Sequence, residues 1–242
     1  MNKPFTDIDN WHEARWGNFT CSLNDKLVDN NGAKAPFTPG GYSYIKQKAV
    51  ECCIRMEERP EMEEFKNFLW GKVYELPAFE AYVQATNNKS LTYLGTHTPL
   101  YLDYEPLKDD SGGSPDVINI TPSFTVDFVA EIKCPKNPAI HFERLKWTNQ
   151  WDIKENLRET YTQIQNLMMI TGAKDADFIS YDGRMLSKRH QVKIISVKAD
   201  KKFQDNLHYR LISAIEHKYK VISQYLEVDV KNKQQLKQLA LR

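Results

Sequence analysis

Asp116, Glu131 and Lys133 are the residues of this sequence whose types and spacing best suit chemistry on a substrate. Asp116 precedes the apolar run 117–120, and Glu131 and Lys133 end a second run, 124–133, that follows a Thr-Pro-Ser turn. Both runs are rich in β-branched and aromatic residues, which predicts a strand, a turn and a second strand. Such a hairpin brings Asp116 to the end of the strand that carries Glu131 and Lys133.

Two carboxylates beside an ammonium group suit hydrolysis assisted by a divalent cation. Side chains alternate along a strand, so Glu131 and Lys133 share one face with Asp127 and Val129, and burial there costs free energy unless they are paired or hold a metal. Carboxylate oxygens are ligands that Mg²⁺ prefers, and a neighbouring lysine can hold or help deprotonate an attacking water. Asp127 lies roughly 13 Å from Glu131 at about 3.3 Å per residue, too far to share an ion. For these residues alone, a simple salt bridge between Glu131 and Lys133 is the stronger interpretation.

Length and charge place these residues in one domain with a basic end. A chain of 242 residues with no Gly/Ser- or Pro-rich linker fits one large α/β domain, which we expect over residues 1–230. Residues 187–242 contain 13 Lys and Arg against 5 Asp and Glu. That asymmetry suits a polyanion, although a basic end is more often a solvated surface. We expect residues 231–242 to form a mobile basic tail.

The sequence contains neither a signal-peptide core nor an apolar run of 18 residues. Its four cysteines lack Cys-x-x-Cys spacing, so a reducing compartment fits them better than disulfides or a metal site. We therefore expect a soluble, cytoplasmic protein that does not bind membranes.

Near the N-terminus, Arg15 stands before a predicted helix that begins near Leu23. Thr20 or Ser22 could cap that helix. A helix N-terminus preceded by an arginine is a ready anion site, because free N–H groups and the guanidinium fork both match a phosphate. Arg15 as an ordinary surface charge is the alternative.

Apolar periodicity predicts four longer helices. These cover residues 42–56, a stretch from about residue 61 with an apolar stripe, residues 155–171 and residues 203–226. Pro77 predicts a kink or restart in the second, because proline lacks the N–H donor and clashes with the carbonyl four residues earlier. The stripe of the second helix consists of Met62, Phe65, Leu69, Val73 and Leu76.

Five local motifs, taken in order, resemble the phage lambda exonuclease and YqaJ recombinase branch of the PD-(D/E)XK nuclease superfamily. Each is weak alone, but their order and spacing make chance a poor explanation. They run from about Trp11 to about Leu226, most of the chain. The motifs are W-H-x-x-R-x-G-x-x-T-x-S at 11–22, G-K-x-Y-E-x-x-A at 71–78, S-P-D at 114–116, E-I-K-C-P at 131–135, and the segment from Gln163 to Met185.

The resemblance implies an α/β (α+β) fold with a central mixed β-sheet flanked by helices, and it assigns roles to side chains by motif. Asp116, Glu131 and the carbonyl of Ile132 would hold one or two Mg²⁺ ions, with Mn²⁺ able to replace them. Glu75 would support the metal directly or through water, and Lys133 with Gln163 would orient the attacking water. Arg15 and Ser22 would bind the 5′-terminal phosphate of DNA. Relatives carry a phosphate-contacting arginine a few residues after the Lys-Cys-Pro, and here either Lys136 takes its place in binding DNA or the contact is absent.

By the same resemblance, the chain is expected to be a Mg²⁺-dependent 5′→3′ exonuclease of double-stranded DNA. It would resect linear ends to 3′ single strands for phage-type recombination, as a ring-shaped homotrimer that works with a single-strand annealing protein in a bacterial host. Two alternatives stay open: an endonuclease of the same superfamily, which would cut closed circles, and a non-catalytic DNA-binding protein of the same fold.

Overall fold

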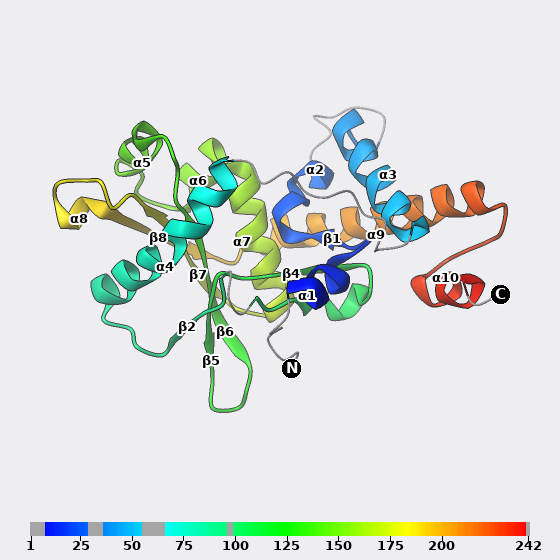
Figure 1. Cartoon of the computed structure of the whole chain (residues 1–242), viewed down its shortest axis with the longest axis horizontal. Helices are drawn as coiled ribbons and strands as arrows, with labels where there is room; N and C mark the ends of the chain where they lie inside the picture. The colour runs from blue at the N-terminus through cyan, green and yellow to red at the C-terminus, as the bar shows by residue number, and fades with distance from the viewer. Residues whose placement is uncertain (1–7, 29–35, 55–65, 96–98, 241–242) are drawn as a thin grey trace.

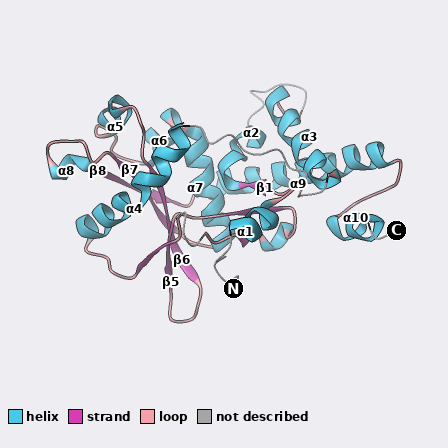
Figure 2. Ribbon diagram, in the orientation of Figure 1, coloured by secondary structure: helices cyan, strands magenta, loops and turns pink. Residues whose placement is uncertain are grey.

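A five-stranded mixed sheet in the order β2-β5-β6-β7-β8 carries helices on both faces (Figure 1). The structure is a computed structural model that describes residues 8–28, 36–54, 66–95 and 99–240. Figure 2 shows how much of the chain is helical around these strands. The helices are α1 (Ile8–Arg15), α2 (Asp25–Val28), α3 (Pro39–Cys53), α4 (Lys66–Thr86), α5 (Pro138–Arg144), α6 (Gln150–Asn156), α7 (Arg158–Thr171), α8 (Lys188–Gln191), α9 (Lys201–Leu226) and α10 (Lys233–Ala240). The strands are β1 (Phe19–Thr20), β2 (Leu91–Tyr93), β3 (Leu102–Asp103), β4 (Ser111–Gly113), β5 (Val117–Ile120), β6 (Val126–Lys133), β7 (Asp175–Tyr181) and β8 (Val192–Lys198).

The predicted strand, turn and strand are β5 and β6, and they form the antiparallel centre of the sheet. Strand β6 also pairs with β7 in parallel, with Lys133 opposite Ser180. The connection between these parallel strands contains α5, α6 and α7, as a parallel pair requires a long crossover. Helix α7 contributes Ile164 and Leu167 to the core on one face of the sheet, and α4 contributes Ala78 and Tyr82 to the core on the other.

The expected alternation of side chains along β6 is interrupted by a bulge at Asp127. Asn119 faces Phe128 while Ile120 faces Val126, so Asp127 has no partner on β5. An extra residue on one strand reverses the order of faces on either side of it. Val126 therefore packs into the same core as Val129, and the prediction that Asp127 shares a face with Glu131 is wrong.

Helix α4 continues through Pro77, where a kink or restart was predicted. Its predicted apolar stripe does not face the core: Leu69, Val73 and Leu76 are exposed, and Met62 and Phe65 lie outside the described residues. The side chains that pack on the sheet are Ala78 and Tyr82, from the half of the helix after the proline.

Two short helices begin in the region 136–152, for which the sequence shows no clear periodicity. Helix α5 starts at an Asn137 cap, and α6 has a capping box in which Asn149 and Asp152 satisfy each other's backbone donors. The predicted helix over 155–171 is divided at Leu157 between α6 and α7, and Gly172 ends α7 with a left-handed conformation, φ 77°.

The N-terminal segment and the C-terminal helices form a second region beside the sheet. Strands β1 and β4 pair in parallel and β3 joins β4 in a small sheet. The helix expected near Leu23 is a short 3₁₀ turn, Cys21–Leu23, followed by α2, and no side chain caps that turn. Helix α9 starts at an Asp200 cap. The expected mobile tail is helical as α10. None of the described helices is long and apolar enough to cross a membrane.

Candidate active site

Asp116 lies against the end of β6, as the hairpin predicts. Its Oδ2 accepts a hydrogen bond of 2.8 Å from the backbone N–H of Ile132. Burial raises the pKa of Asp116 well above its usual range, and the carboxylates of Glu131 and Glu75 raise it further, against the lowering effect of Lys133. Negative charge is therefore concentrated around this carboxyl group.

Glu131, Lys133 and Gln163 form a connected group beside it. Lys133 Nζ donates hydrogen bonds to Glu131 Oε1 at 2.6 Å and to Gln163 Oε1, on α7, at 3.2 Å. Glu131 is only 2% exposed, and its Oε2 has no hydrogen-bond partner among the described residues. Burial alone would lower the pKa of Lys133, but the carboxylates of Glu131 and Asp116 more than offset this and raise it. The salt bridge expected under the simpler interpretation is present, and it leaves one carboxylate oxygen unsatisfied.

Glu75 reaches the same region from α4. Its Oε2 accepts a hydrogen bond of 2.9 Å from the hydroxyl of Tyr93 on β2. Burial raises the pKa of Glu75, and Glu131 adds to this while Tyr93 opposes it. The thiol of Cys134, directly after β6, donates to the carbonyl of Tyr74 at 3.5 Å and ties α4 to the strand. Tyr93 has no signal in the sequence, since an aromatic residue on an edge strand is ordinary.

The donors at this end of β6 fit a divalent cation. The site contains a buried carboxylate oxygen without a partner and two carboxyl groups of raised pKa. A cation bound through oxygen ligands would give that oxygen a partner and would stabilise the ionised form of both carboxyl groups. No three His, Cys, Asp or Glu side chains of the described chain lie close enough to enclose an ion by themselves. Asp116, Glu131, Glu75 and the carbonyl of Ile132 would therefore have to be completed by water or substrate oxygens.

Arg15 lies at the end of α1, with its guanidinium 4.1 Å from the ring centre of Trp11. The indole N–H of Trp11 donates to Ser114 Oγ at 2.9 Å, which connects this segment to the loop that carries Asp116. Burial lowers the pKa of Arg15. No carboxylate of the described residues forms an ion pair with it. Ser22 is exposed in the 3₁₀ turn that follows β1.

Lys136 is exposed three residues beyond Lys133 and takes part in a small aromatic surface. Its carbonyl accepts a hydrogen bond of 3.0 Å from Arg184, whose guanidinium lies 4.7 Å from the ring centre of Trp70. A shallow pocket of about 350 Å³ is lined by Leu69, Trp70, Val73, Tyr74 and Lys136. The sequence motif around Arg184 does not predict its contact with Trp70.

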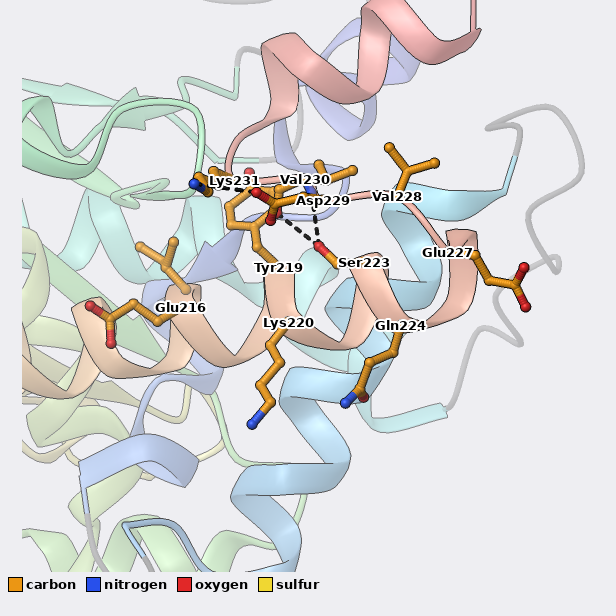
Figure 3. A pocket seen from close by; sticks show the side chains of 11 residues that line it. Glu216, Tyr219, Lys220, Ser223, Gln224, Glu227, Val228, Asp229, Val230 and Lys231 are labelled. Atoms are coloured by element: carbon orange, nitrogen blue, oxygen red, sulfur yellow. Dashed lines mark hydrogen bonds and ion pairs between the residues drawn. The ribbon is translucent and has the colours of Figure 1, made fainter.

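Two other features stand apart from the carboxylates. Asp127 accepts a hydrogen bond of 2.8 Å from Asn119 on the exposed hairpin, as expected of a residue outside the site. A pocket of about 760 Å³ lies between α9 and the segment 227–231, lined by residues such as Tyr219, Ser223 and Lys231 (Figure 3). None of the carboxylates described above lines it.

Comparison with known proteins supplies a family and a fold. A family model described as the YqaJ-like viral recombinase domain matches residues 10–174. LHK-Exo, an alkaline exonuclease from Laribacter hongkongensis, superposes with a TM-score of 0.68 at 23% identity over 90% of this chain and 96% of that one. Its complex with dAMP gives 0.69 at 22% identity, with the same coverage. A phage related exonuclease from Haemophilus somnus 129PT gives 0.64 at 14% identity over 91% and 99% of the two chains. A search of curated proteins finds no match.

Proposed function

Because the chain belongs to the YqaJ-like viral recombinase family, we propose that it is a deoxyribonuclease that hydrolyses phosphodiester bonds from the ends of double-stranded DNA. The observation that carries this proposal is the meeting of Asp116, Glu131, Lys133 and Gln163 at the end of β6. Structures of two exonucleases with the same fold support it. Hydrolysis requires an attacking water, and the site has side chains that can orient this water and side chains that can bind the phosphate through a metal.

Lys133 acts in this proposal as a fixed cation. Glu131 and Gln163 hold its ammonium group from two elements, and its raised pKa keeps it protonated at neutral pH. A protonated lysine donates hydrogen bonds, so it orients an attacking water or stabilises charge on the phosphate and does not act as the base. Gln163 keeps the ammonium group from swinging away.

Asp116, Glu131, Glu75 and the carbonyl of Ile132 are the residues that would hold Mg²⁺ or Mn²⁺ in this site. A bound divalent cation supplies neutralisation of the charge that develops on the phosphate and lowers the pKa of bound water. The unsatisfied Oε2 of Glu131 supports this assignment, because a buried carboxylate oxygen needs a positive partner.

The proposed direction of digestion, 5′→3′, depends on Arg15 and Ser22 as the site for a 5′-terminal phosphate. Arg15 supports this because it is half-buried against Trp11 without a carboxylate ion-pair partner in the described chain, and because Trp11 contacts the loop before Asp116. A guanidinium that lacks an internal anion can take one from a ligand. Lys136 would contact a phosphate of the same strand.

The biological setting that we propose is recombination of phage type in the cytoplasm of a bacterial host. Resection of linear ends would leave 3′ single strands for a single-strand annealing protein. A ring-shaped homotrimer would enclose the duplex. The description of the matched family as viral recombinases supports the setting.

The test is digestion of a linear duplex with 5′-phosphate or 5′-hydroxyl ends, with Mg²⁺, with Mn²⁺ or with a chelator. We expect release of nucleotides with either metal, faster from 5′-phosphate ends, and none with the chelator. Glu131→Gln should abolish the release. A protein that binds the duplex but releases no nucleotides under any of these conditions would contradict the proposal and favour the non-catalytic alternative.

A closed circular duplex separates an exonuclease from an endonuclease. An exonuclease leaves the circle intact and digests it only after linearisation, whereas an endonuclease cuts both forms. Labelling the 5′ or the 3′ end of the linear form then gives the direction from which label is released first.

A further inference from the structure

The turn Trp16-Gly17-Asn18, directly after Arg15, is bound by three charged side chains from distant parts of the sequence. Asn18 N donates to the carbonyl of Arg15 at 3.0 Å, and Gly17 has φ +71°. A side chain at Gly17 would also meet the sulfur of Cys52 at 2.4 Å. The conformation of this turn fixes where α1 ends and therefore where Arg15 stands.

Three distant elements bind the backbone of this turn. Glu51 on α3 accepts from Gly17 N at 3.0 Å, and Lys218 on α9 donates to Gly17 O at 3.0 Å. Lys233 on α10 donates to Trp16 O at 2.9 Å and to the side chain of Asn18. The turn is thus bound from both sides by side chains that lie 34 to 217 residues away in the sequence.

Lys233 is brought to the turn because the segment after α9 folds back. Val230 N donates to Ser223 Oγ at 2.9 Å, and Ser223 Oγ donates to Val230 O at 3.0 Å. Figure 3 shows this pair of bonds between α9 and the returning segment. Val230 is buried with Tyr219, and Leu236 of α10 packs against the same cluster.

The cluster around the turn contains more cations than anions. Lys48, Lys218, Lys233 and Arg15 stand with three carboxylates, Glu51, Asp109 and Asp110. Such an excess creates a positive potential in a region of low dielectric, where an arriving phosphate is attracted. The surplus suits the 5′-phosphate that Arg15 is proposed to bind.

We propose that Lys233 is a positioning residue for recognition of the DNA end: by binding the turn Trp16-Gly17-Asn18, it holds Arg15 where a 5′-phosphate is received. The inference rests on the proposed function and goes beyond it, because it makes α10 part of the end-binding apparatus. Lys233 acts through the turn, and its hydrogen bonds are to Trp16 and Asn18 rather than to the active-site carboxylates or Lys133.

Lys233 is the right member of the cluster to test. Lys218 is fully buried with Asp110, so its replacement would leave an unpaired carboxylate inside the protein and disturb the whole region. Lys233 is partly exposed, and its removal frees the carbonyl of Trp16 and the side-chain oxygen of Asn18, a buried residue whose amide nitrogen keeps its hydrogen bonds to Ala14 O and the Tyr101 hydroxyl. Lys237, an exposed lysine on the same helix, is a matched control.

The experiment compares wild type, Lys233→Met, Lys233→Arg and Lys237→Met on linear duplexes with 5′-phosphate or 5′-hydroxyl ends, with Mg²⁺. We expect Lys233→Met to raise KM for the 5′-phosphate duplex about tenfold and to lose most of the preference over 5′-hydroxyl ends, while kcat changes less than twofold. Lys233→Arg, which keeps the charge, should retain most of the preference. Lys237→Met should behave as wild type. Ser223→Ala, which loosens the segment before α10, should shift the preference in the same direction.

The pH dependence gives an independent readout. Burial and Lys218 lower the pKa of Lys233 to about 8, against the effects of nearby acidic groups. The preference of the wild type for 5′-phosphate ends should therefore decline as the pH rises through 8, and that of Lys233→Arg should not. The groups that face Lys233 are Lys218 and Tyr219 from α9, Cys52 from α3, and Asp109 and Asp110 from the loop before β4.

The outcomes separate this inference from the function on which it rests. If the wild type prefers 5′-phosphate ends and Lys233→Met keeps that preference with an unchanged KM, the inference is wrong and the nuclease assignment stands. If the wild type digests duplexes without preference, both the end-binding role of Arg15 and the role of Lys233 are overturned. Unfolding midpoints in urea, measured for every variant, ensure that a lost preference is not a lost fold.

Discussion

At the scale of single residues, the ammonium group of Lys133 is the contact on which the proposed chemistry depends. It joins Glu131 on β6 to Gln163 on α7, and both contacts are lost when the side chain is removed. Glu131 then loses its ammonium partner, and the attacking water loses its donor. Electrostatic groups of this kind contribute to catalysis through charge that develops in the transition state.

We predict that Lys133→Ala lowers kcat for duplex digestion at least about 100-fold, with KM changed less than about threefold. Rates of nucleotide release give both constants. Lys146→Ala is the control, because Lys146 is an exposed lysine that forms an ion pair with Glu143 on the surface. A Lys133→Ala enzyme with more than a tenth of the wild-type kcat would show that the lysine is structural.

Arg15 gives a second prediction at this scale, which concerns the shape of the side chain. Arg15→Lys keeps the charge but loses the planar fork that stacks on Trp11 and matches a phosphate. We expect both Arg15→Lys and Arg15→Ala to weaken binding of 5′-phosphate duplex, by about threefold and about tenfold or more, with little change for 5′-hydroxyl duplex. Binding can be measured by fluorescence anisotropy with a catalytically inactive Glu131→Gln background. Equal losses on both duplexes would remove Arg15 from end recognition.

The sequence predicts Asp116, Glu131, Lys133 and Gln163 as site residues because their positions follow from strand alternation and from motifs with fixed spacing. It does not predict a role for Tyr93 or Lys233. The first is an ordinary aromatic residue on an edge strand, and the second acts through a turn 217 residues away. Contacts of that separation leave no periodic trace in a single sequence.

At the scale of elements, α4 is unusual because it runs through Pro77. A proline nitrogen cannot donate to the carbonyl four residues earlier, here that of Val73, and the ring crowds that carbonyl. Glu75 lies between these two residues. The helix is kept by the packing of its second half, Ala78 and Tyr82, on the sheet. Sequence rules predict a break here because they include the local destabilisation by proline but not the burial of Ala78 and Tyr82 against the sheet.

We therefore predict that Pro77→Ala raises the free energy of unfolding by about 1 to 3 kcal/mol, because the missing hydrogen bond is restored. Urea denaturation measures the change. Gln84→Ala, at an exposed site on the same helix, should change stability by less than about 0.5 kcal/mol. Loss of stability in Pro77→Ala would mean that the helix around Glu75 requires the proline.

Helix α9 carries a buried ion pair, Lys218 with Asp110, to which Tyr219 also donates at 2.7 Å. Removing one partner of such a pair leaves an uncompensated buried charge. We predict that Lys218→Met costs about 3 to 5 kcal/mol in urea unfolding. Lys220→Met, exposed on the same helix, should cost less than about 0.5 kcal/mol. The double variant Lys218→Met with Asp110→Leu should recover part of the loss, and no recovery would contradict this account.

The elements that the sequence missed share one cause. The bulge at Asp127, the short helices α5 and α6, and α10 are too short for a periodic pattern, and each is fixed by contacts or caps. The long helices α7 and α9 and the hairpin β5–β6 were predictable because an apolar pattern extends through each of them.

At the scale of the whole molecule, the proposed ring predicts an assembly mass of about three times the 28.2 kDa of one chain. Sedimentation equilibrium without DNA measures it directly. We expect digestion of one long duplex to continue after a large excess of competitor is added, because an enclosed duplex does not dissociate between cuts. A monomer whose digestion stops on addition of competitor would contradict the ring.

The contact between Lys233 and the turn at Gly17 has a consequence for a newly made protein. On the ribosome, β7 is complete about 50 residues before Lys233 is added, which is roughly 3 to 10 s at common rates of bacterial translation. A nascent chain can thus assemble the strands that bear its carboxylates while the turn beside Arg15 is still unanchored. Selection of DNA ends would be the last capacity to mature, and an interruption of translation between α9 and α10 would leave a hydrolase unable to tell which ends to enter.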